Sequence, residues 1–258
     1  MLLVKPIHSP EFLKQHNLGV EGVIGWNDQK DNWEQYIPFV KGAHLPHSYG
    51  INLGAINRDD RHHALQKLKQ AIDEARKYSV KRMVVHTSGF EKLDDVLVGE
   101  YAIMIAGLQQ LADYAATDGT VLCIENQVHR EPHKRRIYGD CAEEWFQVLR
   151  DVDRTNTMLT LDSSHAASSV AVIEDAAARR KALFEFLQHP ELIGYVHWSD
   201  SRIENREALY TDMHLVPGSG DLPREFHRRI KQLDCPKLLE QNCTEAEVQE
   251  ALQFIDGL

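Results

Sequence analysis

Histidine, aspartate and glutamate side chains recur at the ends of short apolar segments of this 258-residue sequence. They follow six such segments in chain order, and the set comprises His44, His47, His86, Glu125, Asp162, His165, His197, Asp200, Asp212, His214 and Glu240. Imidazole nitrogens and carboxylate oxygens bind Zn²⁺, Mn²⁺, Co²⁺ or Mg²⁺ in proteins. Acidic side chains that crowd together repel one another unless a cation compensates them. If folding gathers these residues, the sequence predicts a divalent metal site.

The apolar segments themselves are typical of buried parallel strands. They are short, rich in β-branched residues and rarely alternate with polar residues, which indicates strands covered on both faces. The expected strands span Leu2–Val4, Val20–Gly25, Gly42–Leu45, Arg82–His86, Val121–Glu125, Met158–Asp162, Gly194–His197 and Lys237–Glu240.

Helical patterns separate these strands. Ser9 and Pro10 form a helix start, and apolar residues repeat at spacings of three and four between positions 65 and 75 and again between 97 and 115. The pairs Asp140 with Glu143 and Thr244 with Glu247 resemble capping pairs at helix starts. Five histidines on these helical stretches are expected to be exposed to solvent: His16, His62, His63, His189 and His227.

Eight strands, each followed by a helix, predict a single-domain (β/α)₈ TIM barrel that spans residues 1–258. An open doubly wound sheet is the alternative, but the glycine-rich phosphate turn that it would carry after the first strand is missing. Active sites of (β/α)₈ barrels lie at the carboxyl ends of the strands, where the acidic residues and histidines of this sequence occur.

Composition excludes several classes of protein. The chain has 29 Lys and Arg against 39 Asp and Glu, so its formal net charge is −10, which argues against binding to duplex DNA. No run of about 18 apolar residues occurs, and the start of the chain has no signal-peptide core, so no membrane association is expected. Four cysteines without a CxxC motif indicate a reduced, cytoplasmic protein. A homo-oligomer is compatible with all of these features.

Seven blocks in register resemble the xylose isomerase-like TIM barrel superfamily, which includes sugar isomerases, sugar epimerases and apurinic endonucleases of the endonuclease IV type. The blocks are PHSYGINLG, VVHTSG, CIEN, LDSSHA, VHWSDS, DMHLVPGSG and LLEQ. The resemblance runs from about Val20 to the end of the chain.

The resemblance implies a set of metal ligands. Glu125, Asp162, His197 and Glu240 match the four residues that hold the divalent ion shared by the sugar isomerases. The additional positions at which endonuclease IV holds a three-zinc cluster are matched by His47, His86, His165, Asp212 and His214. One ion (Zn²⁺, Mn²⁺, Co²⁺ or Mg²⁺) is therefore expected, and the ligand set has room for up to three.

Two departures distinguish the chain from endonuclease IV. Tyr49 is followed by Gly50, whereas the endonucleases have a bulky apolar residue after the tyrosine and a segment one residue longer. A side chain must fill the gap that a flipped nucleotide leaves in the duplex, and glycine has none. The net charge of −10 also lacks the surplus of lysine and arginine that phosphate backbones require.

These features predict a metal-dependent isomerase or epimerase of a small carbohydrate, acting by proton transfer through an enediolate. Glu125 and Glu240 resemble the carboxylates that remove and return the proton in ketose epimerases, and His165 could stabilise the developing negative charge. His47 and His86 are expected near the substrate. The alternatives are a multi-zinc phosphodiester hydrolase acting on abasic DNA, a keto-sugar lyase or dehydratase, and a non-catalytic barrel.

Arginines at the expected rim indicate an anionic substrate. Arg135 and Arg136 lie in a basic loop after the fifth strand, and Arg202 follows the seventh. Guanidinium groups suit phosphate and carboxylate groups, so these three residues are predicted to bind substrate.

Overall fold

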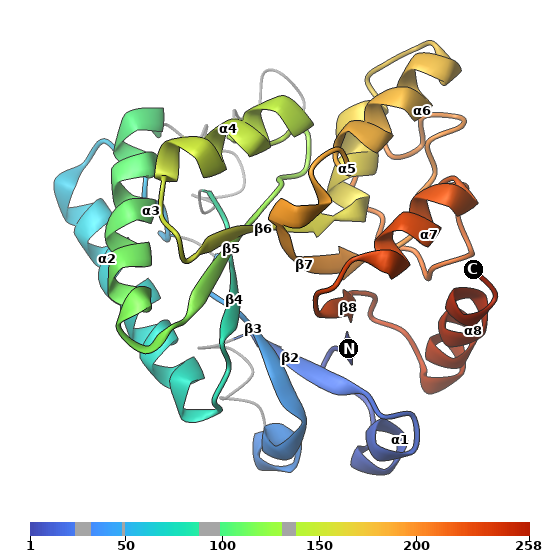
Figure 1. Ribbon diagram of the computed structural model, residues 1–258, viewed down its shortest axis with the longest axis horizontal. Coiled ribbons are helices and arrows are strands. Elements are labelled where there is room, and N and C mark those ends of the chain that lie inside the picture. Colours follow the sequence, from blue (N-terminus) through green and yellow to red (C-terminus); the bar gives the residue numbers. More distant parts are fainter. Residues whose placement is uncertain (24–31, 48–49, 88–98, 131–137) are drawn as a thin grey trace.

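The computed structural model describes residues 1–23, 32–47, 50–87, 99–130 and 138–258, in which eight parallel strands form a closed barrel (Figure 1). The strands are β1 (Leu2–Val4), β2 (Gly19–Val23), β3 (Val40–His44), β4 (Arg82–Val85), β5 (Val121–Glu125), β6 (Thr157–Asp162), β7 (Ile193–Trp198) and β8 (Lys237–Leu239). Each strand pairs with the next, and β8 closes the barrel on β1 through Leu238 and Leu3. The predicted TIM barrel is confirmed, and all eight expected strands form.

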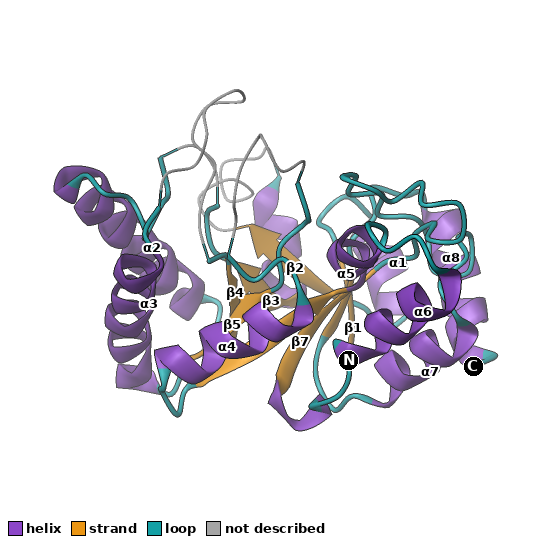
Figure 2. Cartoon of the chain, turned by 90° about the horizontal axis from the view of Figure 1, so that it is seen from above, coloured by secondary structure: helices purple, strands orange, loops and turns teal. Residues whose placement is uncertain are grey.

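Helices cover the outside of the sheet (Figure 2). They are α1 (Pro10–Gln15), α2 (Arg58–Lys77), α3 (Tyr101–Ala115), α4 (Ala142–Val152), α5 (Ser163–Val170), α6 (Ala176–Glu185), α7 (Arg224–Gln232) and α8 (Glu245–Asp256), with short 3₁₀ helices at Trp33–Phe39, Ala116–Asp118 and Pro190–Leu192. Two helices, α5 and α6, connect β6 to β7 where the sequence predicts one. None of the helices in these ranges combines the length and the apolar character needed to cross a bilayer.

Capping residues determine where several of these helices begin. The predicted pair at α8 is confirmed, because Thr244 and Glu247 form a reciprocal capping box. The predicted pair at α4 is wrong: the residue that caps α4 is Cys141, without a side-chain hydrogen bond. Asp140 instead accepts a hydrogen bond from His129, with Nδ1 and Oδ2 2.9 Å apart.

The barrel interior has an apolar floor. Leu3, Val84, Cys123, Tyr195 and Leu238 pack against one another inside the strands, and each is at most 1% exposed. Successive residues of a strand point to opposite faces, so the second residue after an inward one points inward as well.

This two-residue repeat places polar side chains directly above the floor. Glu125 follows Cys123 by two positions, His197 follows Tyr195, and Glu240 follows Leu238. The strands therefore deliver the predicted site residues to one layer at the carboxyl end of the barrel.

Gly42 gives the floor its shape. A Cβ atom at this position would lie 2.0 Å from the hydroxyl oxygen of Tyr195 and 3.0 Å from Leu3. Because no real side chain tolerates the first of these distances, the phenol can occupy the barrel axis only opposite a glycine.

Candidate metal centre

Four residues converge at the end of the barrel: Glu125, Asp162, His197 and Glu240, from β5, β6, β7 and the position after β8. Nδ1 of His197 lies 2.7 Å from Oε1 of Glu125, 2.9 Å from Oε2 of Glu240 and 3.7 Å from Oδ2 of Asp162. Ligand atoms that share one ion at about 2.0–2.2 Å are roughly 3–3.5 Å apart, so these separations suit a common cation.

Unsatisfied atoms support the same conclusion. Nδ1 of His197, Oδ2 of Asp162 and Oε2 of Glu240 are buried and have no hydrogen-bond partner among the described residues. Buried polar atoms are almost always paired, so a group of three that face one another marks a place for a cation. The donor set and its geometry therefore fit a divalent metal ion.

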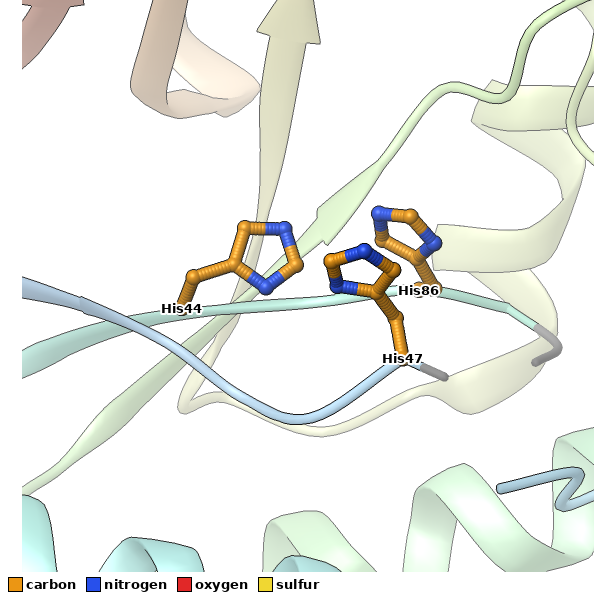
Figure 3. A group of neighbouring side chains, drawn as sticks. All are labelled: His44, His47 and His86. Atoms are coloured by element: carbon orange, nitrogen blue, oxygen red, sulfur yellow. The ribbon is translucent and has the colours of Figure 1, made fainter. Parts of the chain in front are cut away.

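A second group lies beside the first and consists of His44, His47 and His86, at the ends of β3 and β4 (Figure 3). The carboxylate of Glu125 connects the two groups. Its Oε1 faces His197, whereas its Oε2 lies 2.7 Å from Nε2 of His86 and 3.3 Å from Nε2 of His44.

A third group contains Asp162, His165 and His214, with Asp212 alongside. Oδ2 of Asp212 lies 3.3 Å from Nε2 of His165 and 2.7 Å from Nε2 of His214. All nine residues named as possible ligands in the sequence are thus brought together in three adjacent groups. Folding is what joins them, because they are spread from position 47 to position 240.

The side chain of Asp162 serves both the fold and the site. Its Oδ1 caps helix α5 by accepting hydrogen bonds from the backbone N–H groups of Ser164 (2.7 Å) and His165 (2.9 Å). The other oxygen, Oδ2, is left to face His197 and the rest of the cluster.

Helix α5 also positions the third group. Oγ of Ser164 accepts hydrogen bonds from the backbone N–H groups of Met213 (3.0 Å) and His214 (3.1 Å). His214 has a positive φ of 43°, a left-handed conformation that is costly for a residue other than glycine. Backbone strain held in place by a neighbouring helix is typical of residues with a role in a site.

Two members of this interior layer are absent from the ligands that the family resemblance implies: Glu21 on β2 and His44 on β3. Glu21 is 3% exposed, and its Oε2 lies 3.4 Å from Nε2 of His197. A lone acidic residue within the apolar segment Val20–Gly25 is the available signal, but only the closed barrel shows that it faces His197. The sequence marks His44 as a candidate at its strand end, but the family resemblance does not include it among the ligands.

The predicted substrate-binding arginines are not brought into the cluster by any contact that the structure describes. The side chain of Arg202 is 48% exposed and lies 3.9 Å from the carboxylate of Glu207. Arg135 and Arg136 lie outside the described residues, as does Tyr49. Substrate binding by these arginines remains a prediction.

One histidine prediction is wrong. His227 on α7 is fully buried instead of exposed, and its Nδ1 accepts a hydrogen bond from Nε1 of Trp198 at 2.9 Å. Its Nε2 lies 3.4 Å from Oδ2 of Asp200. His227 therefore lies in the interior, in contact with Trp198 and Asp200, and not on the surface.

At His197, His214 and Glu125, neighbouring charges outweigh the cost of burying the ionised side chain. Burial acts to lower the pKa of His197, but the carboxylates of Glu240 and Glu125 raise it well above the ordinary value. For His214, burial is likewise outweighed by Glu240 and Asp212, which raise the pKa to about 9. Burial acts to raise the pKa of Glu125, but the His197 and His86 rings hold it well below its usual range.

These pKa shifts predict how metal binding depends on pH. A histidine binds a metal ion through a ring nitrogen that carries no proton. An ion therefore has to displace the protons that His197 and His214 hold in the metal-free protein. The affinity for Zn²⁺ is therefore expected to rise between about pH 6 and pH 9, with release of protons on binding. Calorimetry in buffers of different ionisation enthalpy measures both quantities, and an affinity independent of pH would exclude these imidazoles as ligands.

Glu21 yields a second prediction. A carboxylate that accepts a hydrogen bond from the outer nitrogen of a ligand histidine fixes the ring and makes it a better donor. Glu21→Gln is expected to weaken Zn²⁺ binding by about 10–100-fold, as measured by competition with a chromophoric chelator. Glu11→Gln, on the exposed face of α1, is the matched control. Equal affinity in both variants would show that Glu21 does not support His197.

The chain is thus a closed (β/α)₈ barrel with an acidic and imidazole cluster that could hold a divalent ion. Residues 18–258 match the sequence family described as xylose isomerase-like TIM barrel, so the chain belongs to this family. No curated protein sequence matches the chain at a significant level.

Solved structures with the same fold include sugar epimerases and a nuclease. A D-tagatose 3-epimerase-like protein superposes with a TM-score of 0.71 at 19% identity, covering 99% of this chain and 98% of that one. D-psicose 3-epimerase in the presence of D-fructose gives a TM-score of 0.68 at 18% identity, covering 95% and 91%. Endonuclease IV from Thermus thermophilus gives 0.64 at 18% identity, covering 99% and 97%. At these identities the likeness shows the fold alone.

Proposed function

We propose that this protein is a divalent-metal-dependent isomerase or epimerase of a small carbohydrate. The convergence of Glu125, Asp162, His197 and Glu240 on one point carries the proposal, because this set combines ligands for an ion with carboxylates that can transfer a proton. The epimerase structures named for D-tagatose and D-psicose support a ketose as the substrate class.

A divalent ion held by these four residues would act as a Lewis acid on adjacent hydroxyl and carbonyl oxygens of the sugar, which makes the neighbouring C–H bond more acidic. Glu125 and Glu240 would remove that proton and return it, because they extend from β5 and from the end of β8, which β6 and β7 separate in the closed barrel.

The two carboxylates differ in their access to solvent. The Glu240 side chain is 19% exposed and can meet a substrate that enters from the rim, whereas the Glu125 side chain is 1% exposed. Glu125 is in contact with Nε2 of His86 at 2.7 Å, and the His86 side chain is 10% exposed. His86 would therefore connect the buried carboxylate with the substrate side.

His165 would bind the negative charge that develops on the sugar. Its Nδ1–H donates a hydrogen bond to the carbonyl oxygen of Asn126 at 2.7 Å, which fixes the ring and leaves Nε2 on the side of the carboxylates. Burial acts to lower its pKa, but Asp162 and Asp212 raise the pKa well above the ordinary value. The proton on Nε2 faces Oδ2 of Asp212 at 3.3 Å, and the substrate oxygen would share this donor with that carboxylate.

Hydrogen exchange tests the proposal even while the product is unidentified. Purified protein loaded with Mn²⁺, Co²⁺ or Zn²⁺ is incubated in D₂O with D-fructose, D-tagatose, D-psicose and their phosphates, and NMR follows deuterium next to the carbonyl carbon. Incorporation is expected for at least one ketose and not with Asp162→Asn. No exchange with any of these sugars and metals would reject the proposal.

A multi-metal phosphodiester hydrolase is the second candidate, and the third group favours it. Asp212, His214 and His165 add ligands that a one-ion isomerase does not need, and two or three ions can activate water for attack on phosphorus. The formal charge of −10 and the glycine at position 50 argue against a DNA substrate. Cleavage of a duplex with an abasic site, without deuterium exchange into sugars, would establish the hydrolase instead.

A further inference from the structure

His44 lies among the candidate metal ligands, although the family resemblance does not imply a ligand at this position. It lies at the end of β3, is 4% exposed and forms a compact group with His47 and His86 (Figure 3). The His44 ring centroid lies 4.7 Å from that of His47 and 5.0 Å from that of His86, and the ligand atoms of the three rings lie within 4.8 Å of one another.

The hydrogen bond at Nδ1 of the His44 ring determines whether Nε2 of the neutral ring carries a hydrogen or a lone pair. Nδ1 lies 2.7 Å from the carbonyl oxygen of Leu45, and because a carbonyl only accepts, Nδ1 carries the hydrogen. In the neutral ring, Nε2 then presents a lone pair. This lone pair faces Oε2 of Glu125 at 3.3 Å, and a carboxylate oxygen is also an acceptor.

Two buried acceptors that face each other need a proton or a metal ion between them. Oε2 of Glu125 is also 2.7 Å from Nε2 of His86, so two imidazole rings compete for the same oxygen. In the metal-free protein, N–H groups on the two Nε2 atoms can both face this oxygen. A single metal ion, by contrast, can accept a lone pair from both rings and from the carboxylate at once.

We propose that His44, His47 and His86 form a three-imidazole metal site, with Oε2 of Glu125 as the fourth ligand. His44 is the new member, since the family resemblance marks only His47 and His86 as positions for an additional ion. The inference goes beyond the proposed sugar chemistry, which needs only the ion of the four-residue group.

The ligand set determines which metals this site selects. Three nitrogens and one oxygen suit Zn²⁺, Co²⁺, Ni²⁺ or Cu²⁺, whereas Mg²⁺ and Ca²⁺ prefer oxygen ligands. An excess of Mg²⁺ should therefore fail to displace Zn²⁺ from this site.

Zinc counting tests the role of His44. The full chain is stripped with a chelator, titrated with Zn²⁺ and analysed for bound metal after gel filtration. His44→Gln is expected to bind one Zn²⁺ fewer per chain than the wild type, or to bind that ion more than about tenfold less tightly, because losing a ligand costs at least as much as losing a supporting contact. His63→Gln, exposed on α2, should keep the wild-type count.

A crystal of the wild type tests the same site without any substitution. After a soak in ZnCl₂, the anomalous signal of zinc is expected between the three rings, with His44 Nε2 among its ligands. An equal zinc count and affinity in His44→Gln would overturn the proposal. So would a zinc ion that leaves His44 in contact with Glu125 alone. These readouts measure metal and not turnover, so they separate failure of this site from failure of the proposed reaction.

Discussion

Glu240→Gln is expected to lower kcat for proton exchange into a ketose by about 10²–10⁴-fold, since the amide cannot take up the proton. The substitution keeps the size of the side chain and one oxygen, so the barrel should remain folded. The proton-transfer role and the ligand role of Glu240 fail together in this variant. Zinc content must therefore be measured beside the rate of deuterium incorporation.

The companion variant Glu125→Gln tests the role of the other carboxylate. If one of them removes the proton and the other returns it, each variant should lose turnover relative to the control Glu250→Gln on the exposed face of α8. Activity within a factor of about two of the wild type in either variant would contradict the assignment of that residue. Full loss of zinc would instead point to a ligand role alone.

Asp200→Ala is expected to cost about 3 kcal/mol of unfolding free energy, because it leaves several buried donors unsatisfied. The carboxylate of Asp200 is 2% exposed and accepts hydrogen bonds from the backbone N–H groups of Ser201 (2.8 Å), Gly218 (2.9 Å) and Leu222 (3.2 Å). His227 lies 3.4 Å from its Oδ2. The backbone of Asp200 also pairs with Leu215, next to His214.

Urea unfolding in the presence of a chelator measures this cost apart from any bound metal. Asp234→Ala, at an exposed acidic position before β8, should change the unfolding free energy by less than about 0.5 kcal/mol. Equal stability of Asp200→Ala and the control would show that the loop after β7 does not depend on this carboxylate. The same variant should also weaken metal binding by the third group, because the backbone of Asp200 pairs with Leu215, next to His214.

The barrel can be predicted from the sequence because local signals repeat along it. Eight short β-branched segments and the capped helices between them leave few other topologies, and all eight strands form where they are expected. The extra helix α6 escapes the prediction because its residues, Ala176–Glu185, bury only Arg179 and Leu183 and show little amphipathic pattern.

The site is harder to predict than the fold. Strand ends identify candidate ligands, but whether an interior residue such as Glu21 faces a ligand depends on the register of strands that are distant in the chain. The polarity of histidine alone predicts an exposed His227. Its neighbours Phe226 and Ile230 lie on the buried face of α7, and with Trp198 they place the ring in the interior.

The apolar floor formed by Leu3, Val84, Cys123, Tyr195 and Leu238 determines from which side a ligand can reach the cluster. It packs across the middle of the barrel, directly beneath the cluster, which leaves the carboxyl ends of the strands as the side of approach. An ion and any substrate of the proposed reaction would therefore reach the cluster from the same end of the barrel.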